Sequence, residues 1–111
     1  MDLFGFMDMQ GTYGQRKVAR HDDGTLFVDT ARVTDGAQPF ETAVAHPQYN
    51  DGAMVIVEAY DTREDAEVGH ERWVQRMTIG PLPDVLTDCA NAGVGVLLEA
   101  FDGVQIFPRQ E

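Results

Sequence analysis

Four segments in the first half of the chain have the length and residue pattern of β-strands, and they differ in how strictly apolar and polar residues alternate. The segments are residues 16–20, 25–34, 40–46 and 53–60. Turn sequences such as Asp-Asp-Gly at 22–24 and Asn-Asp-Gly at 50–52 separate them. These connections are too short for a parallel crossover, which needs roughly a dozen residues or more. The pattern therefore predicts an antiparallel sheet of about four strands.

The predicted strands differ in the polarity of their two faces. Both faces of segment 25–34 mix polar and apolar residues, which is typical of a strand near a sheet edge. Segment 53–60 is apolar on both faces, which is typical of a central strand.

The pattern changes to a helical period after Tyr60. Thr62 is a favourable helix start because its hydroxyl can accept an amide of the first turn, and Glu64 and Asp65 favour the positive end of the helix dipole. We expect a helix over residues 63–77. Its apolar face contains Ala66, Gly69, His70, Trp73, Val74 and Met77. This face should pack on the sheet.

The C-terminal third has two interpretations. Val85, Leu86 and Cys89 follow Asp84 at helical spacing, and residues 94–101 fit either a strand or a continuation of that helix. We favour the helix, although its two glycines cost about 1 kcal/mol each. Residues 104–107 are expected to add a short closing strand. The expected fold is a single α+β domain over residues 1–111, with one main helix across the sheet and a C-terminal helical segment.

Composition excludes several classes of protein. Nineteen acidic and eight basic residues give a formal net charge of −11, which disfavours direct contact with nucleic acids or anionic membranes. The single cysteine, Cys89, cannot form an intramolecular disulfide, and the N-terminus lacks the basic region of a signal peptide. We therefore expect a protein of the cytoplasm.

No motif assigns a metal, a cofactor or a catalytic residue. The zinc, calcium, P-loop and dinucleotide signatures are missing from the sequence. His70 lies on the apolar helix face, and we favour a hydrogen-bonded core histidine over a proton-transferring one. Trp73 is expected to anchor the core, and Cys89 to be a small buried hydrophobe rather than a nucleophile.

Five residues are candidates for a binding site. His46, Tyr49 and Asn50 lie at a strand end and in the loop after it, where binding groups are often displayed. We expect them on the surface at one end of the sheet, with Arg32 and Glu41 from neighbouring strands, facing a protein or a nucleotide-like ligand. In the alternative interpretation Asn50 adopts a left-handed turn conformation and Tyr49 folds back on the apolar face.

Two runs of residues resemble small tailed-phage and prophage proteins that have no assigned reaction. The runs are F-E-T-A-V-x-H-P-x-Y-N at 40–50 and Y-D-T-x-E-x-A-x-x-G-H-x-x-W-V at 60–74. The similarity covers roughly residues 26–92. It implies a phage origin and supplies no catalytic residues.

The resemblance and the absence of a catalytic motif lead us to expect a non-enzymatic phage accessory or virion-associated protein, located in the host cytoplasm or the virion. We expect it to act through protein contacts. The apolar run at residues 3–7 and the sheet edges also predict a homo-oligomer. One alternative is an inhibitor of host defence that sequesters a nucleotide signal or blocks a defence protein. Another is a small hydrolase-like enzyme with His46 or His70 as general base.

Overall fold

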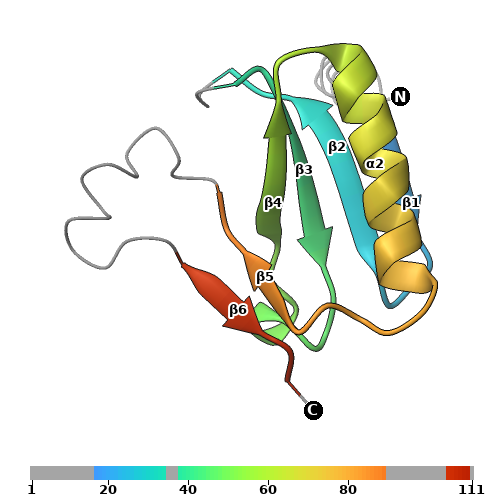
Figure 1. The fold of residues 1–111 in the computed structure, drawn as a ribbon, viewed down its shortest axis with the longest axis vertical. Coiled ribbons are helices and arrows are strands. Elements are labelled where there is room, and N and C mark those ends of the chain that lie inside the picture. Colours follow the sequence, from blue (N-terminus) through green and yellow to red (C-terminus); the bar gives the residue numbers. More distant parts are fainter. Residues whose placement is uncertain (1–16, 35–37, 90–104, 111) are drawn as a thin grey trace, which may run out of the picture.

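The computed structural model describes residues 17–34, 38–89 and 105–110. Its main feature is a four-stranded antiparallel sheet in the order β1-β2-β3-β4, with one long helix across one face (Figure 1). The elements are β1 (Lys17–Asp22), β2 (Phe27–Arg32), β3 (Phe40–Ala45), the 3₁₀ turn η1 (Asn50–Gly52), β4 (Val55–Tyr60), α2 (Arg63–Thr78), β5 (Val85–Thr87) and β6 (Ile106–Pro108). The predicted α+β class, with four antiparallel strands and one main helix across them, is confirmed.

The connection between β1 and β2 is a tight hairpin stabilised by aspartate side chains. Asp22 Oδ1 accepts a hydrogen bond from the amide of Gly24, and Asp23 Oδ1 accepts from the amides of Thr25 and Leu26. Gly24 has a φ of 91°, a conformation that residues with a side chain rarely adopt. These bonds explain why the Asp-Asp-Gly sequence turns the chain here.

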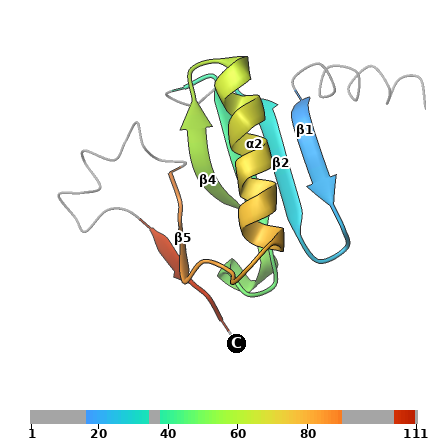
Figure 2. The ribbon, with the colours of Figure 1, turned by 45° about the vertical axis from the view of Figure 1, so that its right-hand side comes forward.

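Helix α2 begins at the predicted residue and packs with the predicted face. Thr62 Oγ1 accepts the amide of Asp65 at 3.1 Å, which satisfies one of the free donors of the first turn. The buried residues of the helix are Ala66, Gly69, His70 and Met77, with Trp73 and Val74 half-buried. Figure 2 shows the helix in front of β2, with β4 and β1 on either side of it. Among the described elements, no helix or strand packs on the other face of the sheet.

The expected strand positions are wrong for two strands. β2 is an interior strand, and β4 is an outer strand of the four-stranded sheet. The free side of β4 is contacted by the segment after β5, where the amide of Cys89 donates to the carbonyl of Ile56 at 2.7 Å. Val55 and Val57 pack in the core on the α2 side, and the segment after β5 pairs with the outer edge of β4, so an outer strand can carry apolar residues on both faces.

The predicted C-terminal helical segment is wrong at its start, because Val85–Thr87 form strand β5. Leu86 is buried while Val85 and Thr87 are exposed, and Leu86 pairs with Phe107 of β6. Asp88 and Cys89 follow β5 without helical structure. Residues 90–103 of that predicted segment lie outside the described residues, as does the apolar run at residues 3–7. The short closing strand is confirmed as β6.

Two apolar clusters form the core between the sheet and α2. The larger contains Leu26, Val28, Val44, Tyr49, Val55, Met77 and Leu86, and the smaller contains Phe40, Tyr60 and Ala66. Within residues 17–34, 38–89 and 105–110, no helix has the length and apolar character needed to span a membrane.

Candidate functional site

The five candidate residues fall into two groups at opposite ends of the sheet. Arg32 pairs with Phe40 at one end of the β2–β3 ladder, whereas the other end, where Phe27 pairs with Ala45, leads into His46. Arg32 and Glu41 therefore lie apart from His46, Tyr49 and Asn50. A single site built from all five residues is not formed.

Tyr49 belongs to the core, so its expected place on the surface is wrong. Its side chain is 0% exposed, and its hydroxyl donates a hydrogen bond to the carbonyl of Pro83. Burial raises the pKa of Tyr49. Asn50 has a φ of 51° and opens the η1 turn that folds Tyr49 inward. The structure thus has the alternative arrangement, in which both residues shape the loop.

His46 is half-buried beside Tyr49. Its Nδ1 atom accepts the amide of Gln48 at 3.1 Å, and its ring meets the Tyr49 ring edge-on with 5.8 Å between centroids. His46 also lines an open depression of about 630 Å³ between the β1–β2 turn and the loop after β3. Its observed contacts stabilise the turn.

Arg32 and Glu41 contribute to a groove on the sheet face opposite α2. The groove has a volume of about 250 Å³. Its lining residues, which define the outer-face groove, are Asp29, Ala31, Arg32, Val33, Glu41, Ala43, Met54 and Ile56. Most of these side chains are apolar, and two are carboxylates.

The strand register explains how the groove is assembled. Asp29 pairs with Ala43 and Ala31 pairs with Glu41, so Asp29 and Glu41 are diagonal neighbours on the same sheet face. The guanidinium of Arg32 lies 5.9 Å from the centroid of the Phe40 ring. Because Phe40 packs with Tyr60 and Ala66 on the α2 side, this contact directs the guanidinium toward that side of the sheet.

A β-bulge in β4 places Ile56 and Glu58 on opposite faces of the sheet. Ile56 pairs with Ala43, whereas Glu58 pairs with Thr42, so Val57 is an extra residue between two register positions. Ile56 consequently lines the outer-face groove while Glu58 faces α2. Strict alternation would have placed Ile56 and Glu58 on one face, which is why sequence reasoning missed the groove.

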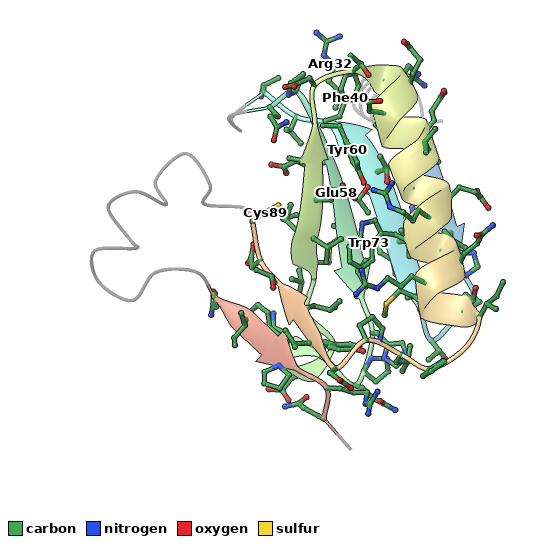
Figure 3. All side chains as sticks on the ribbon, viewed as in Figure 1. Arg32, Phe40, Glu58, Tyr60, Trp73 and Cys89 are labelled. Atoms are coloured by element: carbon green, nitrogen blue, oxygen red, sulfur yellow. The ribbon has the colours of Figure 1, made fainter. Side chains whose placement is uncertain are left out.

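A chain of hydrogen bonds runs through the helix side of the sheet. Thr30 Oγ1 is 2.8 Å from His70 Nδ1 and 2.6 Å from Thr42 Oγ1, and Thr42 Oγ1 is 2.9 Å from the Tyr60 hydroxyl. The Tyr60 hydroxyl donates in turn to Glu58 Oε1 at 3.1 Å. Figure 3 shows Glu58 and Tyr60 on β4 directed toward α2.

The direction of every proton in this chain follows from the carboxylate at its end. A carboxylate can only accept hydrogen bonds, so the Tyr60 hydroxyl donates its single proton to Glu58. The Thr42 hydroxyl must then donate to the Tyr60 oxygen. By the same count Thr30 donates to Thr42, and His70 Nδ1 donates to Thr30. Nδ1 of His70 therefore carries a proton, and because burial lowers the pKa of His70 from 6.5, the neutral imidazole protonated on Nδ1 is the favoured form. The predicted core histidine is confirmed, with a threonine hydroxyl as its partner.

Glu58 is held by donors from α2 as well. Its Oε1 atom accepts from Trp73 Nε1 at 2.8 Å and from Arg72 Nη2 at 2.6 Å. Burial on its own would raise the pKa of Glu58, but the hydrogen bonds from Trp73, Arg72 and Tyr60 together lower it. The carboxylate is therefore ionised and attaches the helix to β4.

Neither a metal-binding cluster nor a thiolate is found among the described residues. In the part of the chain that the structure describes, no group of three or more His, Cys, Asp or Glu residues is arranged to hold a metal ion. Burial raises the pKa of the Cys89 thiol to about 11, so the thiol is protonated at neutral pH. No protein-family model, curated protein or solved structure matches the chain.

Proposed function

We propose that this chain is a non-enzymatic phage accessory or virion-associated protein that acts through protein contacts. The observation that carries the proposal is the outer-face groove. Among the described elements, α2 covers one face of the sheet and no helix or strand packs on the other (Figures 1 and 2). The uncovered face of an antiparallel sheet is usually polar. An apolar groove on such a face is typical of a contact surface.

The contacts of the three histidines and the protonated thiol of Cys89 favour structural roles over catalytic ones. His21 Nε2 lies 3.2 Å from Asp23 Oδ2 in the hairpin turn, His46 accepts an amide of its own loop, and His70 donates into the buried chain. A general base needs a lone pair directed at a substrate, and a cysteine nucleophile needs a thiolate. The roles of these side chains in the structure are those of turn and core residues.

The two runs that resemble phage proteins coincide with residues that hold the fold together. Thr62 caps α2, Gly69 contacts Tyr60, and His70 and Trp73 attach the helix to the sheet. Of the residues that line the groove, only Glu41 and Ala43 fall within these runs. The two runs therefore consist mainly of residues that hold the scaffold together.

The proposal is tested by following the full-length protein during phage production. We expect it either in gradient-purified particles at a fixed copy number or in a defined complex with one protein of the infected cell, as measured by quantitative mass spectrometry. A complex with a host defence protein would favour the inhibitor alternative. Absence from both particles and complexes would contradict the proposal.

A nucleotide-sequestering function is separated from protein contact by a ligand screen. A ligand at about 100 times its dissociation constant adds ~2.7 kcal/mol to the free energy of unfolding. We expect no such stabilisation by mono-, di- or cyclic nucleotides in thermal unfolding experiments. A reproducible increase in melting temperature with one nucleotide would instead support the sequestering inhibitor.

A further inference from the structure

We infer that the outer-face groove receives a basic segment of the partner protein, in which a lysine or arginine lies between apolar side chains. This inference rests on the proposed function and specifies the chemistry of the partner. The apolar lining, the carboxylates of Asp29 and Glu41, and the net charge of the chain together lead to it.

The size of the groove fits side chains better than a whole small molecule. Its volume of about 250 Å³ lies below the ~300–1,000 Å³ typical of small-molecule pockets. Ala31 and Ala43 are short, and Ala43 is only 7% exposed, so small side chains form the floor of the groove. Met54 is 47% exposed and provides an accessible apolar contact at the β4 side. An extended segment could lay one or two side chains on this floor.

The charge of the groove selects for a basic group. Asp29 and Glu41 are diagonal neighbours on adjacent strands and are both half-buried. Both carboxylates also interact within the chain. They therefore act on a partner through their electrostatic potential and not as unpaired charges. Coulomb attraction is stronger at a partly buried position than in bulk water.

Two arginines lie close to these carboxylates and reduce that potential. Arg32 lines the groove, with its guanidinium over the Phe40 ring. Arg20 pairs with Asp29 across β1 and β2, and its guanidinium lies 4.5 Å from the centroid of the Phe27 ring. The lining residues comprise two carboxylates and one guanidinium, and that guanidinium lies over Phe40, so the formal charge of the lining is acidic.

Charge also disfavours the chain itself as the occupant. A second copy would bring another formal charge of −11. The sequence at residues 1–16 carries Asp2 and Asp8 against Arg16, and the sequence at 90–104 carries Glu99 and Asp102. An external basic segment is favoured because opposite potentials attract and like charges repel.

The experiment titrates the full chain with three capped five-residue peptides, V-R-V-R-V, V-Q-V-Q-V and V-E-V-E-V, and follows the backbone amide signals by NMR. We expect the arginine peptide to bind most tightly and to shift the amides of Ala31, Ala43 and Ile56. Its affinity should fall when salt rises from about 0.05 M to about 0.5 M, since exposed charges are screened. Equal binding of the three peptides, or shifts confined to other surfaces, would overturn the inference.

Matched charge variants locate the interaction. Glu41→Gln should weaken the arginine peptide by about fivefold, as expected for one ion pair. Glu64→Gln, an equal charge change on the exposed first turn of α2, should leave its affinity unchanged. Equal effects of the two variants would mean that the attraction is not specific to the groove. Thermal unfolding of both variants verifies that they remain folded.

The outcomes separate this inference from the proposed function. If the protein is found in particles or complexes but the arginine peptide is not preferred, protein contact stands and the basic partner is wrong. If sedimentation shows a dimer that Met54→Lys dissociates and Val68→Lys does not, a second copy occupies the groove and the inference is also wrong.

Discussion

At the level of single residues, Gly69 allows α2 to lie close against Tyr60 of β4. A Cβ atom added there would overlap the ring and the hydroxyl of Tyr60. We therefore expect Gly69→Ala to lower the free energy of unfolding by ~1–3 kcal/mol through overpacking. This loss would occur although alanine gains about 1 kcal/mol of helix propensity over glycine. Urea unfolding measures the difference.

A double-mutant cycle isolates the Gly69–Tyr60 contact. When Tyr60 is first replaced by alanine, Gly69→Ala should become neutral or stabilising, because the overlapping ring is gone. If Gly69→Ala is equally destabilising with and without the Tyr60 ring, the close approach is not the cause.

His70 should make the protein less stable in mild acid. Burial lowers its pKa from 6.5, His21 adds to this effect, and the charges of Glu71 and Asp29 oppose it. Between pH 6.5 and the lower folded-state pKa, the unfolded chain binds a proton that the folded chain excludes. The free energy of unfolding should therefore fall as the pH drops from about 7 to about 5.

The variant His70→Asn tests this origin, since an amide keeps an N–H donor for Thr30 and does not titrate. Urea unfolding at several pH values should show a smaller pH slope in this variant than in the wild type. Parallel slopes would show that other groups cause the acid sensitivity.

At the scale of elements, α2 is held to β4 by two donors to one carboxylate oxygen. Trp73 is half-buried, whereas the Arg72 side chain is 55% exposed. We expect Trp73→Phe to cost ~1.5–3 kcal/mol, the value for a hydrogen bond to a charged group, and Trp73→Ala to cost ~3–5 kcal/mol. Arg72→Ala should cost at most ~1 kcal/mol, because exposed ion pairs contribute little.

Chemical denaturation of these variants ranks the two donors. A loss for Arg72→Ala that equals or exceeds the loss for Trp73→Phe would mean that the ion pair, rather than the indole, attaches the helix.

The local sequence pattern was sufficient to predict the elements that are stabilised mainly by neighbouring residues or by packing of one face on the sheet. The hairpin, the start of α2 at Thr62 and its buried face follow from turn chemistry, capping and the helical period. β5 could not be predicted in this way, since its three residues suit a helix equally well. Its conformation depends on the pairing of Leu86 with Phe107, far along the sequence.

At the scale of the whole molecule, the groove and the polar chain depend on which strands become neighbours. Thr30, Thr42 and Glu58 are unremarkable in sequence and meet only because β2, β3 and β4 are adjacent. Asp29 and Glu41 likewise become diagonal neighbours through register. The sequence could suggest Arg32 and Glu41 as candidates, but the bulge that turns Ile56 toward them is set by three-dimensional pairing.

We propose that the outer-face groove is the surface through which this protein contacts its partner. The most direct measurement compares how Met54→Lys and Val68→Lys associate with the particle or the complex found for the wild type. Both residues are exposed, at 47% and 64%, and both variants should keep a melting temperature close to that of the wild type. We predict that Met54→Lys loses association and that Val68→Lys, on the outer surface of α2, keeps it. Full association of the folded Met54→Lys variant would show that the outer-face groove is not the contact surface.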